Sequence, residues 1–253
     1  MTNSYKSSFF IKLQKKYSEL VDEYNLKNEK IDVKAKSLTP EEAIGITKRD
    51  DYVILKGKER LLQATMLGSK GQAFTNAQGN FSGTLEEILN MPLENDFQRA
   101  IYVATLNAVL CYTGKEEKTI HCRNEKPEKC SEKAIEYFVE NYNNKKILMI
   151  GYQPTLAESI KKKGFEIKVL DLDPDNIGKT KNGIVIRNGN TDLKKYLEET
   201  DVIFATSSSI CNGTIDTIYD KNKPLIFFGT SGAGAAKLMG ITRFCPEATS
   251  GKN

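Results

Sequence analysis

KKILMIGYQPTLAESIKKKGFEIKVLDLDPDNIG, residues 145–178, holds the pattern that decides the fold. An apolar run at 147–150 precedes a helix-like segment from Pro154 to Gly164, and a second apolar run follows at 167–170. Short apolar runs of this kind are typical of strands that are buried on both faces of a parallel sheet and joined by a right-handed crossover. The stretch therefore predicts a β-α-β unit that can hold a ligand at the carboxyl ends of its strands.

The rest of the C-terminal half repeats this alternation of strand and helix. Further strands are expected at 184–186, 202–205 and 225–228, with helices at 193–199, 214–219 and 233–239. Together with the opening unit they predict an α/β fold built on a doubly wound parallel sheet of five strands.

The N-terminal half has a different pattern. Apolar residues at three-and-four spacing predict helices at 5–25, 84–89 and 96–112, and strands are expected near 31–35, at 52–55 and at 61–66. The glycine-rich stretch 68–83 is expected to be a loop that either approaches a ligand or turns corners. Arg99 and Asn107 stand out as polar residues on the largely apolar last helix.

A charged connector at 116–129 separates these two patterns. Because strands and helices mix before it and alternate after it, the sequence predicts two domains, a smaller α+β unit at 1–115 and an α/β unit at 116–253.

Composition sets the broad class of protein. The 253 residues are 39% hydrophobic and 28% charged, with a net charge of +4 that is spread along the chain. No apolar run is long enough for a membrane span, and Lys12 follows at once on the apolar residues 9–11, so a cytoplasmic protein is expected. A nucleic-acid partner is disfavoured because no basic block is present. The sequence leaves open whether the protein forms a homo-oligomer.

The first strand-to-helix turn resembles a dinucleotide fingerprint only in position. It has Gly151 but lacks the second and third glycines of that motif, which disfavours the usual mode of NAD binding. Asp171 ends the second strand, where acids that bind ribose lie. A solvated turn with helix-capping aspartates is an equally good interpretation of Asp171.

The loops after the fourth and fifth strands are rich in hydroxyl groups and small residues. They bring free backbone N–H groups to one rim of the sheet, which favours an anionic group, although tight packing of helix on sheet would select the same residues. The candidate ligand-binding residues, with those of the first turn, are Gly151, Asp171, Thr206, Ser207, Ser208, Asn212, Thr230, Ser231 and Gly232.

Thiol and imidazole groups form the second candidate set. The single histidine and four of the five cysteines are interpreted as an open or transient transition-metal site that uses at least two of them, since these groups suit soft and borderline metals. The candidates are His121, Cys122, Cys130, Cys211 and Cys245. The sequence does not identify the metal.

Two alternatives to metal binding remain for these residues. A free cysteine in a core behaves as a small hydrophobic residue, which is the default for Cys111. A nucleophilic cysteine paired with the histidine is the other alternative, because Cys130 near a helix start could have a lowered pKa.

Several of these motifs together resemble the family called "putative heavy-metal chelation", whose function is unknown. They are residues 149–178, the run from Thr206 through Thr214, GTSGAGAA at 229–236 and RFCP at 243–246. The resemblance implies a Rossmann-like C-terminal domain, an N-terminal domain similar to that of enolase, and a site in the cleft between them. It also implies metal handling or a role in an anaerobic cofactor pathway related to cobalamin.

The leading hypothesis is a protein that binds a metal ion or a small anionic metal chelate in this cleft. Cys211 and the hydroxyls of residues 207–209 would form the floor, Thr230 and Ser231 would hold an anion, and His121 with Cys122 would reach in from the connector. The alternative is a methyltransferase-like enzyme with a nucleotide-type cofactor, in which Asp171 contacts a ribose. A scaffold without catalysis is a third hypothesis, because no nucleophile, base and orienting group can be grouped from the sequence.

Overall fold

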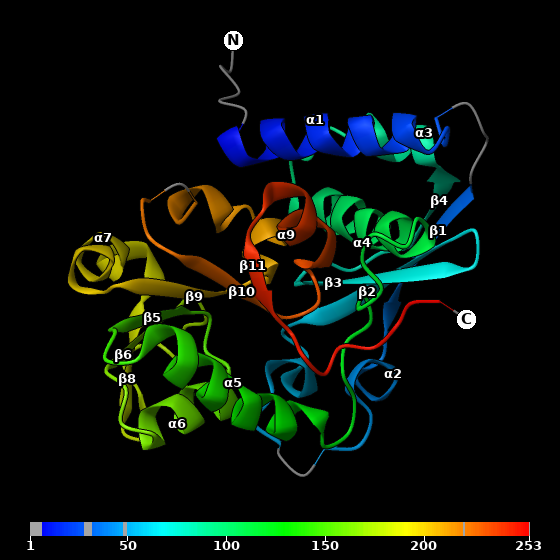
Figure 1. Ribbon diagram of the computed structural model, residues 1–253. Coiled ribbons are helices and arrows are strands. Elements are labelled where there is room, and N and C mark those ends of the chain that lie inside the picture. Colours follow the sequence, from blue (N-terminus) through cyan, green and yellow to red (C-terminus); the bar gives the residue numbers. More distant parts are fainter. Residues whose placement is uncertain (1–6, 28–31, 48–49, 220, 253) are drawn as a thin grey trace.

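The computed structural model describes residues 7–27, 32–47, 50–219 and 221–252. It contains two sheets, one in each half of the chain (Figure 1). No helix in this described part combines the length and apolarity that a membrane span requires.

The N-terminal half is a four-stranded antiparallel sheet with helices on it. The strands lie in the order β3 (Ser69–Thr75), β2 (Arg60–Met66), β1 (Asp32–Leu38), β4 (Phe81–Thr84). Helix α4 (Asp96–Tyr112) packs across β3 and β2, and α1 (Ser8–Glu23) buries its apolar face in the same core. The short helices are α2 (Pro40–Ile44), η1 (Val53–Lys56) and α3 (Leu85–Leu89).

The C-terminal half contains a seven-stranded, mostly parallel sheet. Its order is β11 (Thr242–Phe244), β10 (Leu225–Phe228), β9 (Val202–Thr206), β5 (Ile147–Ile150), β6 (Ile167–Asp171), β8 (Ile184–Asn188), β7 (Thr180–Lys181). All neighbouring pairs are parallel except β7 and β8.

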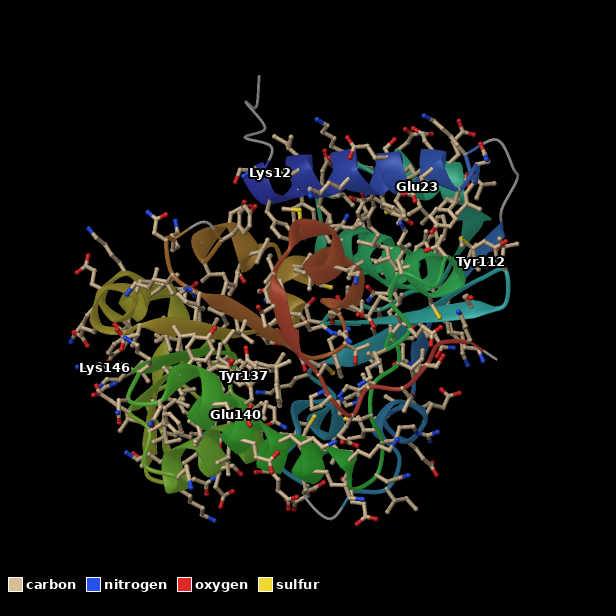
Figure 2. The ribbon with its side chains drawn as sticks, viewed as in Figure 1. Lys12, Glu23, Tyr112, Tyr137, Glu140 and Lys146 are labelled. Carbon is tan, nitrogen blue, oxygen red and sulfur yellow. The ribbon has the colours of Figure 1, made fainter. Side chains whose placement is uncertain are left out.

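Helices cover both faces of this sheet. Helices α5 (Lys126–Tyr142) and α6 (Pro154–Lys162) bury an aromatic and aliphatic core against one face, and Figure 2 shows Tyr137 and Glu140 on α5. The other face carries α7 (Gly189–Glu199), α8 (Ser208–Cys211) and α9 (Ala233–Met239). The remaining helical turn is η2 (Thr214–Thr217).

One core joins the two halves. Helix α4 contacts both its own sheet and helices α8 and α9, and α1 packs on α9 and η2. Figure 1 shows α1 beside α9. Buried side chains from α1, β2, α4, β9 and α9 therefore belong to one continuous cluster.

Most expected elements of the C-terminal half are present, and the differences have local causes. All five expected strands form the sheet, as β5, β6, β8, β9 and β10. The two further strands, β7 and β11, are two and three residues long, too short to show a pattern.

Two expectations for the N-terminal half were wrong. Residues 52–55 are not a strand paired with β2, because β1 and β3 already occupy both edges of β2, and the segment around η1 instead buries Tyr52 and Ile54 beside α2. The stretch 68–83 is not a loop, since it contains β3 and most of β4. The strand expected near 31–35 is β1, and Ile31 lies outside the described residues.

Gly71 explains why β3 has no strand-like pattern. A Cβ at this position would lie 2.3 Å from the Ala104 carbonyl oxygen and 2.3 Å from the Ala108 nitrogen, both on α4. The glycine therefore allows the strand backbone to approach the helix backbone. Close packing of β3 on α4, rather than a turn or a ligand, accounts for the glycine at this position.

Candidate functional site

A cavity of about 820 Å³ lies at the carboxyl ends of the parallel strands. The turns after β5, β6, β9 and β10 form one wall, and the opposite wall comes from η1, β3 and the connector. Of the candidate residues, the cleft is lined by Gly151, Asp171, Thr206, Ser207, Ser208, Asn212 and His121. That they bind a ligand stays a prediction.

The first turn is shaped by Gly151 and held by Asp171. Gly151 has a φ of +84°, and a Cβ there would lie 2.5 Å from the Thr206 methyl group, so only glycine fits. The Asp171 carboxylate accepts hydrogen bonds from the backbone N–H groups of residues 152, 172 and 173 at 3.0, 2.6 and 2.8 Å, and from Asn176 Nδ2 at 3.1 Å. These four donors engage both carboxylate oxygens in structural bonds, so a ribose hydroxyl would have to displace one of them.

The floor of the cleft contains buried hydroxyl groups without partners. Thr206 Oγ1 and Ser208 Oγ are hydrogen-bonded at 2.9 Å. The Oγ atoms of Ser207 and Ser209, each only 1% exposed as residues, have no hydrogen-bond partner in the described structure. Buried polar groups are nearly always hydrogen-bonded, so these two hydroxyls need a partner that the described residues do not provide.

His121 places a neutral imidazole on the opposite wall. Its ring packs edge-on against Phe74 with the centroids 5.1 Å apart, and its backbone N–H donates to Gln72 Oε1 at 2.7 Å. Burial lowers the pKa of His121 to about 4, against a smaller opposing effect of the Cys122 backbone. Its buried Nδ1 has no hydrogen-bond partner among the described residues. A neutral imidazole is the form that coordinates metals.

Lys58 and Glu59 line the same cleft and were not singled out from the sequence. Lys58 Nζ lies 2.6 Å from Asp173 Oδ1 and 2.5 Å from Asp175 Oδ2, and these ion pairs tie the segment after η1 to the turn after β6. Burial, with the nearby charges of Asp171 and Asp173, raises the pKa of Glu59 to about 7. The contacts of Lys58 with Asp173 and Asp175 join segments more than a hundred residues apart, so no local sequence pattern predicts them.

The raised pKa of Glu59 makes stability depend on pH. Because the folded carboxyl binds its proton more tightly than the unfolded one, stability should fall as pH rises from about 4.5 to about 7. Glu59→Gln cannot ionise and should be more stable than wild type at pH 8, by about 1–3 kcal/mol. The two proteins should agree at pH 4. Urea unfolding at pH 4, 6 and 8 measures this difference, with Glu86→Gln, at an exposed position of α3, as control. A constant difference in stability across pH would contradict the prediction.

Three of the candidate cysteines lie together outside the cleft. Cys122, Cys130 and Cys245 lie close enough to one another to influence one another's pKa. The pKa of Cys130 is lowered chiefly by the hydrogen bond from Cys122, whereas that of Cys122 is raised chiefly by the same bond. Although adjacent, His121 lines the cavity and Cys122 joins the thiols.

Cys211 is separate from this group. It is buried in α8, where burial raises its pKa and Ser231 and Arg99 are neighbours. The described residues contain no group of three or more His, Cys, Asp or Glu side chains that could hold a metal ion. Metal binding by the cysteines therefore stays a prediction.

The loop at 230–232 packs against the N-terminal half instead of lining the cleft. Ser231 Oγ accepts the Phe74 N–H at 2.8 Å, and a Cβ on Gly232 would lie 2.7 Å from that of Ser207. Asn107 Nδ2 donates to the carbonyl oxygens of Thr230 and Ser231 at 3.3 and 3.2 Å. These contacts favour the packing interpretation of the small residues here.

Comparison with known proteins shows a family domain in the C-terminal half. Residues 133–238 match the family model DUF364, described as "Putative heavy-metal chelation", so the chain contains a domain of this family. The matched range contains the cleft residues from Gly151 to Gly229 but not the three clustered cysteines. No curated protein matches the chain.

Two solved structures are similar. A DUF364 protein of unknown function from Pyrococcus horikoshii shares 20% identity over 89% of this chain and 80% of its own, with a TM-score of 0.54, which shows a common fold. A second DUF364 protein of unknown function, from Desulfitobacterium hafniense, shares 14% identity over 71% of each chain with a TM-score of 0.48.

Proposed function

We propose that this protein binds a small anionic metal chelate in the 820 Å³ cleft. The observation that carries the proposal is that three residues lining this cavity each hold a buried polar atom without a partner: His121 Nδ1, Ser207 Oγ and Ser209 Oγ. The imidazole can coordinate a metal, and the hydroxyls can donate to anionic oxygens.

A chelate fits these residues better than a bare ion does. No three metal-binding side chains among the described residues come together, so one imidazole would have to hold the metal alone. A metal that brings its own ligands needs only one or two protein donors, and the cavity is large enough for a small molecule. The description "Putative heavy-metal chelation" supports a metal in the ligand, because residues 133–238, which match this family, form most of one wall of the cleft.

The topology supports a Rossmann-like C-terminal domain. Numbered along the chain and leaving out β7, the parallel strands lie in the order 6-5-4-1-2-3, which is that of doubly wound nucleotide-binding sheets read from the other edge. We place this domain at 116–253, after an α+β domain similar to the N-terminal domain of enolase at 1–115. The transferase alternative is less favoured, because Asp171 already accepts four hydrogen bonds.

Thermal unfolding with metal complexes tests the proposal. Co(II), Ni(II) and Zn(II) are added as aquo ions and as nitrilotriacetate complexes, and the complexes are expected to stabilise the protein more. A ligand at 100 times its Kd stabilises the folded state by about 2.7 kcal/mol. His121→Phe keeps the contact with Phe74 but removes Nδ1, and should weaken binding at least about tenfold.

Two controls make the result specific. Ser209→Ala should lose part of the stabilisation, whereas Tyr137→Phe, on α5 away from the cleft (Figure 2), should lose none. The proposal is wrong if no complex stabilises the protein, or if His121→Phe responds as wild type does.

A further inference from the structure

One lysine links the two walls of the cleft. Lys58 follows η1 on the wall that the N-terminal half builds, and Asp173 lies on the opposite wall, in the turn after β6. Lys58 Nζ is 2.6 Å from Asp173 Oδ1 and 2.5 Å from Asp175 Oδ2. A single ammonium group therefore holds both carboxylates and bridges the space between the walls.

This bridge lies on the solvent side of the cleft. The side chains of Lys58, Asp173 and Asp175 are 36%, 17% and 71% exposed, whereas Ser207 and Ser209 on the floor are each only 1% exposed. A contact that joins the two walls so near to solvent spans the entrance of the cleft. A molecule that takes this route to the floor has to pass the Lys58 side chain.

The bridge can open while the fold stays intact, because ion pairs exposed to solvent stabilise a protein little and are screened by salt. Other contacts hold the walls: Tyr52 and Ile54 are buried beside α2, and the Asp171 carboxylate accepts backbone N–H groups of the turn after β6. Gly57 precedes Lys58 with a φ of +71°, and no atom of the described residues lies within 4 Å of the position that a Cβ would take. Packing therefore does not restrict the chain next to Lys58.

We propose that the bridge from Lys58 to Asp173 and Asp175 is a salt-sensitive gate of the cleft. With the ion pairs formed, the lysine side chain crosses the entrance and slows the passage of small molecules to the floor. With the ion pairs broken, the side chain swings into solvent and the passage widens. The gate acts whatever the cleft binds, so the gate and chelate binding can fail separately.

His121 provides a chemical reporter of the gate. It is the only histidine of the chain, and it lines the cleft on the wall opposite the turn after β6. Diethyl pyrocarbonate acylates neutral imidazole, and the reaction is followed by absorbance and located by peptide mass mapping. The acylation rate of His121 in the full chain therefore measures how easily a small molecule enters the cleft.

Lys58→Met keeps a long side chain that cannot form ion pairs. In metal-free buffer of low salt concentration, His121 of this variant should react about three to ten times faster than in wild type, as expected for the loss of two exposed ion pairs. In about 1 M NaCl, where the Debye length is about 3 Å, the wild-type rate should rise towards that of the variant, which itself responds little. Each rate is divided by that of N-acetylhistidine in the same buffer, which removes the effect of salt on the reagent.

Lys56→Met is the matched control. Lys56 ends η1, is exposed and lies near Asp175, but it takes no part in the bridge, so His121 of this variant should react at the wild-type rate. The gate is overturned if Lys58→Met reacts no faster than wild type or if Lys56→Met is accelerated equally. A wild-type rate that does not rise with salt overturns it too, and this measurement decides the matter even if Lys58→Met fails to fold.

Discussion

Asn107→Ala is expected to lower the free energy of unfolding by about 3–5 kcal/mol. Asn107 is fully buried on α4, and its Nδ2 donates to the Gln72 carbonyl oxygen at 2.8 Å as well as to the loop at 230–231. Its Oδ1 accepts the Gly234 N–H at 2.7 Å in the first turn of α9. One amide thus ties β3, the loop after β10 and α9 to α4.

The size of the effect follows from what alanine leaves behind. Several buried backbone groups lose a partner, and each unsatisfied group costs about 1–3 kcal/mol unless water reaches it. Urea unfolding at neutral pH measures the change. Asn141→Ala is the matched control, because that exposed amide donates only to the carbonyl of Tyr137 within α5 and should change stability by less than about 0.5 kcal/mol. A loss below about 1 kcal/mol for Asn107→Ala would show that the halves do not depend on this amide.

Gly71→Ala is expected to destabilise the fold by about 3 kcal/mol or more. The added methyl group would meet backbone atoms of α4 at 2.3 Å, and backbone cannot move aside as a flexible side chain can. Strand β3 and helix α4 would have to separate, which disturbs the continuous core between the two halves. Chemical unfolding, monitored by circular dichroism, gives the value.

Gly68→Ala is the control for Gly71→Ala. Gly68 lies just before β3 with a φ of +76°, and no atom lies within 4 Å of the position that a Cβ would take, so only the backbone strain of alanine remains, about 1 kcal/mol. If both substitutions cost the same, close packing of β3 on α4 is not what selects Gly71.

The sequence predicted the parallel sheet well because its strands are buried on both faces. Such strands are apolar throughout, so Ile147–Ile150 and its neighbours can be recognised without knowing their partners. Residues 52–55 were misassigned for the opposite reason. Whether an apolar segment becomes a strand depends on a free edge of its partner strand, and both edges of β2, which follows this segment, are taken by β1 and β3.

The sequence predicted which residues line the cleft where their position directly after a parallel strand is enough to place them there. Gly151, Asp171 and Thr206 follow parallel strands, whose carboxyl ends meet at one edge, and all three line the cleft. Thr230 and Ser231 also follow a strand, but the demands of packing on α4 and β3 determine their contacts. Local sequence cannot separate these two outcomes.

Contacts made across the fold were not predictable. Glu59 meets Asp171 and Asp173 only because η1 folds over the turn after β6. Likewise, Cys245 reaches Cys122 and Cys130 because the chain returns to the connector after β11. The sequence supplied the residue types, and their grouping required the tertiary structure.

Metal and ligand analysis of protein purified without oxygen tests chelate binding most directly. Wild type and His121→Phe are purified in parallel, and each is examined by elemental analysis and by mass spectrometry of the native complex and of its organic extract. Chelate binding predicts a transition metal together with a small acidic organic molecule in wild type, both strongly depleted in His121→Phe. Equal metal content in the two proteins, or metal held without an organic ligand, would contradict it.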